Sequence, residues 1–334
     1  MNAGAFGIAQ WRHAVRLLAG AALVVLSVPV PARSQEAGAT HLVVISGVSG
    51  EPRIAESWHS MAMALHAAAI SRFGLPAQNV TLLTEDSTRD PARITGRSTR
   101  ANVERVLGAL ARSLKADDRL VVVLFAHGSS LSGATMVNLP GPDMSDADFK
   151  RVLAPATAPM VAFIHTGSAS GEFAPALGGV RRIVITATKS AREQNETLFP
   201  GYFVRALTTD VGDTDKDGRV SLLEAFTYAT HEVEQLFAQG NRLPTEHPQL
   251  ADGADGGRAR SFFLAPAGGA SLAANPAAAP LLRERAELQA SIGGLRARKA
   301  DMSEEAYQRA LEPLMIKLAE ASRALRALGG GAKP

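Results

Sequence analysis

Short apolar runs alternate with amphipathic segments over the first 264 residues of the chain. The near-continuous apolar runs, typical of strands buried on both faces, cover residues 41–47, 80–84, 119–126, 160–165 and 182–187. Segments with apolar residues at helical spacing, or with helix-capping signals, cover residues 55–73, 99–114, 145–153, 200–207 and 221–239. A last strand is expected at residues 261–264. This alternation predicts an α/β fold, an α/β/α sandwich with a mainly parallel sheet.

The pattern changes after residue 264. Residues 265–280 are rich in Ala, Pro and Gly, which predicts a linker. Residues 281–328 have helical periodicity, interrupted at 299–303, and predict an antiparallel helical hairpin or a coiled-coil arm. Pro313 is expected to kink the second helix. The apolar stripe of this segment needs a partner, so the main domain or an oligomer formed through these helices is expected to cover it.

Residues 1–35 have the pattern of a signal peptide. Arg12 and Arg16 form a positive region, residues 17–30 are uncharged and mostly apolar, and Ala32 ends a small-residue cleavage site. The apolar run is short for a membrane span. We therefore expect export to the periplasm or the extracellular space, with no transmembrane span after cleavage. An uncleaved membrane anchor is the alternative.

Composition narrows the possible functions. Hydrophobic residues make up 46% of the chain, which is enough for a substantial core. The net charge is +3, with both signs spread along the sequence and no basic run interleaved with aromatics, so nucleic acid is not an expected partner. The chain has no cysteine, which excludes disulfides, thiolate metal sites and a cysteine nucleophile.

Two expected strands end in residues that could carry chemistry. The run ending at residue 126 is followed by His127 and Gly128, and the run ending at His165 enters a turn that contains Ser168. Parallel strands present their carboxyl ends at one edge of a sheet, where ligands bind. His127 could then act as a base, Ser168 as a nucleophile and the Gly128 amide as an oxyanion-hole donor. The alternative is that His127 only bonds the backbone at its strand end, and His165 is expected to be a core histidine.

Residues 122–129 followed by residues 164–173 resemble the caspase–legumain clan of cysteine peptidases, nearest the legumain-type branch. The resemblance extends through residues 183–188 to 245–250 and covers residues 40–264. It implies a caspase-like domain over those residues.

The resemblance matches His127 to the catalytic histidine of the clan and Ser168 to its catalytic cysteine. A thiol is partly ionised near neutral pH, whereas a hydroxyl needs a well-placed base to become a nucleophile. We therefore expect a catalytically silent or weak peptidase homologue that binds a peptide or protein partner. The alternatives are an active serine-type hydrolase using Ser168 and His127, and a structural assembly protein acting through the C-terminal helices.

Residues 213–224, here called the acidic loop, match the ligand pattern of an EF-hand-type calcium loop. Loop positions 1, 3, 5, 7, 9 and 12 are Asp213, Asp215, Asp217, Arg219, Ser221 and Glu224, and Gly218 stands at position 6. Arg219 would contribute its backbone carbonyl, and Glu224 both carboxylate oxygens. The pattern predicts bound Ca²⁺, with the weak affinity of about 10⁻⁴–10⁻³ M that extracellular modules show. The alternative is an acidic turn stabilised by capping bonds, without an ion.

Overall fold

The computed structural model describes residues 38–131, 134–157, 159–215, 219–253, 257–264 and 275–328. The expected signal segment lies outside the described residues, as do residues 265–274 of the expected linker. No described helix combines the length and the apolar character that crossing a bilayer requires.

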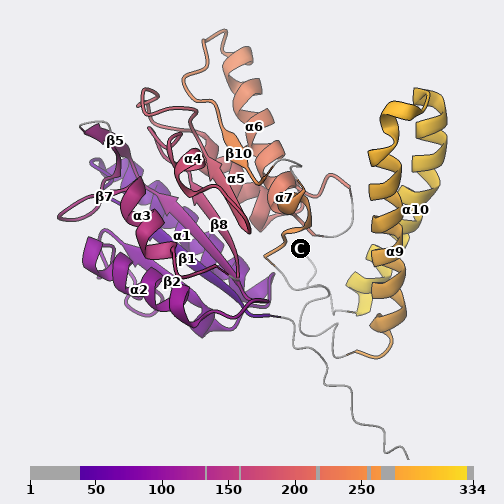
Figure 1. The fold of residues 1–334 in the computed structure, drawn as a ribbon, viewed down its shortest axis with the longest axis horizontal. Helices are drawn as coiled ribbons and strands as arrows, with labels where there is room; N and C mark the ends of the chain where they lie inside the picture. Colours follow the sequence, from indigo (N-terminus) through magenta and orange to yellow (C-terminus); the bar gives the residue numbers. More distant parts are fainter. Residues whose placement is uncertain are drawn as a thin grey trace, which may run out of the picture. The chain divides into compact units, whose positions relative to one another are not determined.

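The main domain is built on a seven-stranded sheet with the order β10-β9-β8-β4-β1-β2-β3. Every neighbouring pair is parallel except β9 and β10, which are antiparallel. The strands are β1 (Thr40–Ser46), β2 (Val80–Thr84), β3 (Gly96–Arg97), β4 (Arg119–Phe125), β8 (Met160–His165), β9 (Arg182–Thr186) and β10 (Gln249–Ala251). The predicted α/β fold with a mainly parallel sheet is confirmed (Figure 1).

Strand side chains alternate between the two faces of a sheet, and these strands carry apolar residues on both. Helices therefore cover both faces. In β1, Leu42 and Val44 belong to one apolar cluster, and Val43 and Ile45 belong to the other. The first cluster includes residues of α1 (Pro52–Ser71), α5 (Phe199–Thr208), α6 (Leu222–Gln239) and α7 (Arg258–Ser261). The second includes residues of α2 (Arg100–Ser113), α3 (Asp146–Leu153) and α4 (Phe173–Leu177). The three layers form the expected α/β/α sandwich.

A small second sheet follows β4 and was not predicted in the sequence. It consists of antiparallel β5 (Gly128–Leu131), β6 (Ala134–Val137) and β7 (Met144–Ser145). Its short strands carry Ser, Thr and Gly, so they lack the apolar pattern that predicts a buried strand. A 3-10 turn, η1 (Ala77–Asn79), precedes β2.

The strand predicted at residues 261–264 is wrong. Ser261 ends α7, and Phe263 makes only an isolated antiparallel bridge to Ser221. The apolar character of this segment has another cause, because Phe262 and Leu264 are buried in the cluster beneath α6. The closing strand is instead β10, which is only half-buried.

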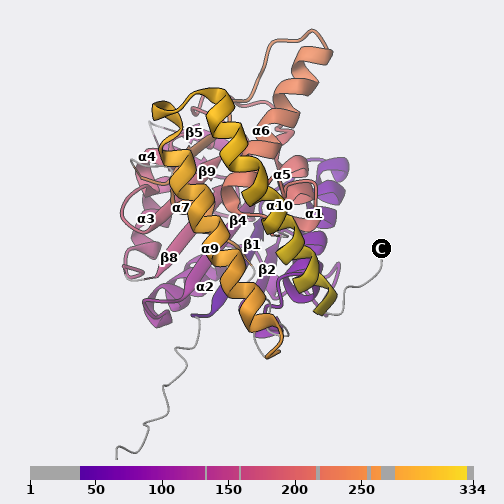
Figure 2. The same ribbon diagram turned by 90° about the vertical axis from the view of Figure 1, so that its right-hand side faces the viewer.

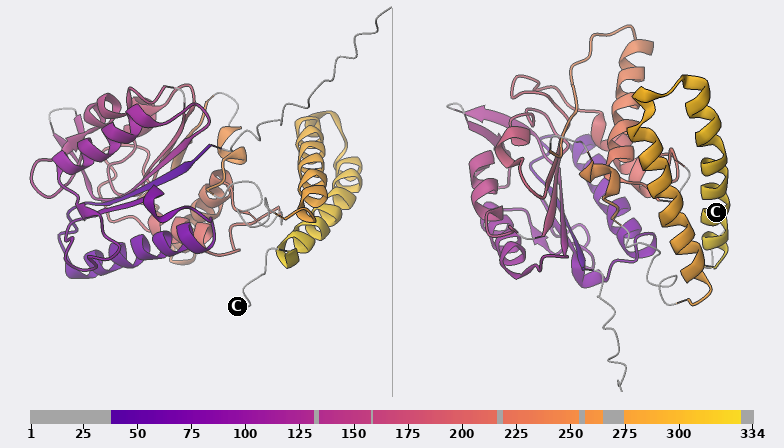
Figure 3. Two further views of the ribbon diagram at one scale, coloured as in Figure 1. Left: turned by 90° about the horizontal axis from the view of Figure 1, so that it is seen from below. Right: turned by 45° about the vertical axis from the view of Figure 1, so that its right-hand side comes forward.

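The C-terminal segment forms two long helices joined by a 3-10 turn. They are α9 (Ala278–Ala297), η2 (Lys299–Asp301) and α10 (Glu304–Leu328). The helices run antiparallel, side by side (Figures 2 and 3), and Leu288, Ile292 and Leu318 are buried between them. Helix α9 begins three residues earlier than predicted, with Pro280 in its first turn, where a missing N–H breaks no intrahelical bond. Pro313 lies inside α10, which continues past it.

Candidate functional site

The topology of the sheet singles out the carboxyl ends of β1 and β4. The chain passes from β1 outward to β2 and β3, and then returns to the other side of β1 with β4. Connections therefore leave these two neighbouring strands in opposite directions. Ligand sites in open α/β sheets lie at such a switch point. Gly47 follows β1 here, and His127 follows β4.

The turns that follow β4 and β8 are in close backbone contact. A Cβ on Gly167 would lie 1.6 Å from the Ala126 carbonyl oxygen, and one on Gly128 would lie 2.4 Å from that of Ser168. Neither approach leaves room for a side chain. The glycines therefore allow the two strand tips, residues 126–128 and 166–171, to meet.

Ser168 is buried in this contact, at 2% exposure. Its hydroxyl accepts a hydrogen bond from the Gly128 amide over 3.4 Å. The next residue, Ala169, has a positive φ of 51° and donates its N–H to the Glu193 carbonyl at 2.7 Å. The Gly128 amide thus points at the Ser168 hydroxyl itself, rather than at a separate oxyanion position.

His127 contacts a different part of the chain. Its Nε2 lies 3.2 Å from the Ser49 carbonyl oxygen, and its ring packs against Trp58 with 5.0 Å between centroids. A carbonyl only accepts, so this contact requires the proton on Nε2. Among the described residues, no hydrogen bond joins His127 to Ser168. The arrangement is that of a strand-end histidine bonded to the backbone.

His165 is fully buried, and burial lowers its pKa to about 3. Its Nδ1 accepts from the Gly167 amide at 3.2 Å, and its ring packs edge-on against Phe173. A neutral, enclosed imidazole of this kind positions the turn between β8 and Ser168. It is the core histidine that the sequence favours.

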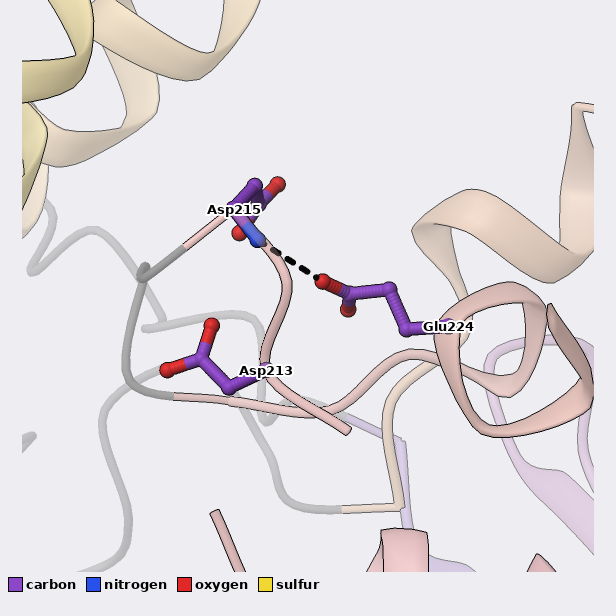
Figure 4. A group of neighbouring side chains, drawn as sticks. All are labelled: Asp213, Asp215 and Glu224. Atoms are coloured by element: carbon purple, nitrogen blue, oxygen red, sulfur yellow. Dashed lines mark hydrogen bonds between the residues drawn. The ribbon is translucent and has the colours of Figure 1, made fainter. Parts of the chain in front are cut away.

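The acidic loop connects α5 to α6 on one face of the sheet. Figure 4 shows Asp213, Asp215 and Glu224 gathered around one point, and one carboxylate oxygen from each lies within 4.8 Å of the others. Asp213 is buried, and the other two are half-buried. Asp217 and Gly218 of the sequence pattern lie outside the described residues.

Glu224 holds the loop together. Its Oε1 accepts from the amides of Thr214 and Asp215 at 3.1 and 3.3 Å. Its Oε2 accepts from the amide and the hydroxyl of Ser221, each at 2.9 Å, while the Ser221 hydroxyl accepts from the Glu224 amide. This capping box begins α6, where the helix dipole also favours a carboxylate.

The three carboxylates fit a hard divalent cation. Calcium binds oxygen at about 2.3–2.6 Å, so two ligands of one ion lie at most about 5 Å apart. The 4.8 Å spread of the cluster satisfies this limit. The cluster contains no imidazole, which the softer transition metals prefer. The Arg219 side chain lies over the Phe263 ring, 3.7 Å from its centroid, so only its backbone is a candidate ligand.

Sequence reasoning missed Glu246, a buried acid near the strand tips. Its two oxygens accept from the amides of Leu198 and Phe199 at 2.8 and 3.2 Å, at the start of α5. Burial raises its pKa to about 7 despite these bonds. The partners lie 48 and 47 residues away, so no local pattern indicates this contact.

No protein-family model matches the sequence, and the search of curated proteins gave no match either. Function is therefore inferred from the geometry of the strand tips and of the acidic loop.

Proposed function

We propose that the chain is an exported, catalytically silent protein of the caspase–legumain type that binds Ca²⁺ through the acidic loop. We further propose that it binds a peptide or protein partner along the carboxyl edge of its sheet. The observation that carries the calcium assignment is the convergence of Asp213, Asp215 and Glu224. Export rests on the pattern of residues 1–35, and the family on the residues around His127 and Ser168.

Electrostatics supports the calcium assignment. Two unit charges 4.8 Å apart repel by about 0.9 kcal/mol even at the dielectric constant of water, and by several-fold more near a protein surface. The three carboxylates therefore repel one another when no ion lies between them. A divalent cation at their centre replaces this repulsion with attraction.

The geometry of the strand tips supports the proposed lack of catalysis. A serine nucleophile needs a base within hydrogen-bond reach of its hydroxyl. The Ser168 hydroxyl has the Gly128 amide as its neighbour, and the His127 Nε2 is directed to the Ser49 carbonyl. Neither contact draws the proton from Ser168.

Two measurements test the proposal. Isothermal titration of Ca²⁺ into chelator-treated full-length protein should show one site, which Asp213→Asn combined with Glu224→Gln abolishes. The matched control is Asp210→Asn, an exposed acid paired with Arg72 outside the cluster. Heat that persists unchanged in the double variant would remove the calcium assignment.

The second measurement compares the wild type with Ser168→Ala on peptide and ester substrates at saturating Ca²⁺. We expect no turnover above the buffer rate in either protein. Turnover that the substitution abolishes would instead establish the alternative, a serine hydrolase using Ser168 with His127 as base. The close approach of Gly128 and Ser168 is the observation that keeps this second function worth testing.

A further inference from the structure

A cavity of about 50 Å³ lies beside His127, between the carboxyl ends of β1 and β2 and helix α1. Ser46 and Thr84, the last residues of the two strands, are buried and line the cavity. Trp58 and Ser49, which both contact the His127 side chain, line it as well. The cavity therefore adjoins the switch point of the sheet and shares residues with it.

Ser46 gives this cavity a polar atom that the fold does not use. The residue is 5% exposed, and its hydroxyl oxygen has no hydrogen-bond partner among the described residues. Strand alternation places its side chain on the same face as Leu42 and Val44, which is the face covered by α1. A buried hydroxyl without a partner destabilises a fold, and alanine would fill this position without that cost. The hydroxyl oxygen is itself buried, and a donor that entered the cavity would give it the partner that the fold does not supply.

The mouth of the cavity carries acidic groups. The Glu85 Oε2 accepts hydrogen bonds from the amide and the hydroxyl of Ser49. No described hydrogen bond goes to its Oε1, so that oxygen could accept from a ligand. Asp86 also lines the cavity, and the hydroxyl and amide of Thr88 lower its pKa by hydrogen bonding. Asp86 is therefore anionic near neutral pH.

Arg89 and His59 are the basic residues that line the cavity, and the Arg89 guanidinium is engaged with other protein groups. It forms an ion pair with Glu56, which does not line the cavity, and a hydrogen bond to the Ala55 carbonyl. The two acids Glu85 and Asp86 therefore outnumber the one guanidinium at the cavity, and the lining also offers hydroxyl oxygens. An occupant with a positive charge and several N–H donors matches both features.

We propose that this cavity is a subsite for a primary ammonium group, that of a lysine side chain on a peptide lying across the carboxyl edge of the sheet. An ammonium offers three donors, which suits the Ser46 hydroxyl and the Glu85 carboxylate together. The volume exceeds the roughly 10–15 Å³ that one water requires in a cavity, so an ammonium group has room there. The Trp58 ring provides an apolar wall for the aliphatic stem and a face that attracts cations.

This inference rests on the peptide-binding part of the proposed function and is independent of the calcium site. It names the chemistry of the partner, a lysine-bearing peptide. The same ammonium chemistry could come from a free amine, so the experiment includes both sources.

Tryptophan fluorescence reports on the cavity directly. The chain has two tryptophans, Trp11 and Trp58, so full-length protein carrying Trp11→Phe has its only tryptophan at the site. The probes are n-butylamine, an acetylated and amidated Gly-Lys-Gly peptide, and the same peptide with norleucine, which keeps the stem and lacks the ammonium. We expect a saturable change with the lysine peptide, and binding weaker by about tenfold or more with the norleucine peptide, because a charged donor is lost.

Substitutions test the two residues that the inference uses. Ser46→Ala and Glu85→Gln should each weaken the lysine peptide by about tenfold. Ser46→Ala should also keep or raise the melting temperature, which separates loss of binding from loss of folding. The matched control is Glu51→Gln, because Glu51 is an exposed acid at the start of α1 that does not line the cavity. It should leave binding unchanged.

Each result decides the proposal. Equal binding of the lysine and norleucine peptides would overturn the subsite while leaving peptide binding in place. No response to either n-butylamine or the lysine peptide would also overturn it, and the cavity would then be a water site. Unchanged binding in both cavity variants would have the same consequence. A response to n-butylamine alone would support the ammonium subsite and remove the peptide partner from the proposed function.

Discussion

Replacing Asp213 by Asn should change the stability of the protein in opposite directions with and without calcium. The substitution removes one charge from the cluster of Asp213, Asp215 and Glu224 and keeps the shape of the side chain. In the ion-free protein that charge is repelled by two neighbours. In the calcium-bound protein it is attracted to the ion. The substitution should therefore stabilise the ion-free protein and destabilise the calcium-bound protein.

The ion-free effect follows from the geometry of the loop. Oxygen atoms within 4.8 Å give a repulsion of about 0.9 kcal/mol per pair at the dielectric constant of water. Relieving two such pairs should stabilise the chelator-treated variant by about 1–2 kcal/mol. For a domain of this size, each 1 kcal/mol corresponds to roughly 2–4 °C in melting temperature. We expect Asp213→Asn to melt a few degrees above the wild type in EDTA.

Calcium should reverse this order. With a dissociation constant of about 10⁻⁴–10⁻³ M, 10 mM free Ca²⁺ stabilises the wild type by about 1.4–2.7 kcal/mol. That gain corresponds to a rise of at least about 3 °C. Asp213→Asn has lost a charged ligand, so its own rise should fall below about 1 °C. The wild type should then melt above the variant.

Thermal unfolding followed by circular dichroism measures both effects at matched ionic strength. Asp210→Asn is the control, because Asp210 pairs with Arg72 at 2.6 Å and does not belong to the cluster. It should keep the full calcium increment. The same melting temperature for wild-type protein in EDTA and in calcium would refute the reasoning. So would an increment in Asp213→Asn as large as that in the control.

Three further expectations come from other parts of the molecule. Glu224→Gln should lower the melting temperature both in EDTA and in calcium, because Glu224 caps α6 and bonds the loop amides as well as facing the proposed ion site. A melting temperature that falls only in calcium would contradict this. Glu246 has a pKa raised to about 7 from 4.5, so its contribution to stability is fully present below about pH 4.5 and is lost by about pH 7. Glu246→Gln should remove this decline in the free energy of unfolding, which amounts to at most about 3 kcal/mol between pH 4 and 8. Urea unfolding measured across that pH range tests this, and the same pH dependence in the wild type and the variant would disprove it. Pro313→Ala should raise the helical signal and melting temperature of the C-terminal hairpin, since proline inside a helix costs up to about 3 kcal/mol, and an unchanged melt would argue against strain at this position.

The sandwich was predictable because its strands are buried on both faces. Strand β2 has the bounds that the sequence indicates, and β1, β4, β8 and β9 begin and end within one residue of expectation. A buried parallel strand must be apolar throughout, so its pattern depends little on its neighbours. Strand β10 was missed for the opposite reason. It has three half-buried residues at the sheet edge, and only its pairing with β9 makes it a strand.

The two candidate sites also differ in how far local sequence alone could predict them. The clustering of the acids in the acidic loop could be predicted because they lie within twelve residues, so local geometry alone brings Asp213 and Glu224 together. The relation between His127 and Ser168 spans 41 residues and depends on which way each side chain turns. The Nε2 of His127 turns toward the Ser49 carbonyl, which lies 78 residues earlier in the chain. No spacing rule in a sequence specifies such a choice of rotamer.

Helix α5 sets the physical relation between the acidic loop and the strand tips. Glu246 accepts hydrogen bonds from the first amides of this helix. The next residue, His247, forms a hydrogen bond with the Glu193 carboxylate. The Glu193 carbonyl in turn accepts from Ala169, beside Ser168. The other end of α5 leads into the acidic loop, and its ten residues span about 15 Å. The calcium ion that we propose at Asp213 would lie beyond the opposite end of this helix from the Glu246 contact. Such an ion would influence the strand tips through the position of α5, and we therefore propose a structural role for it.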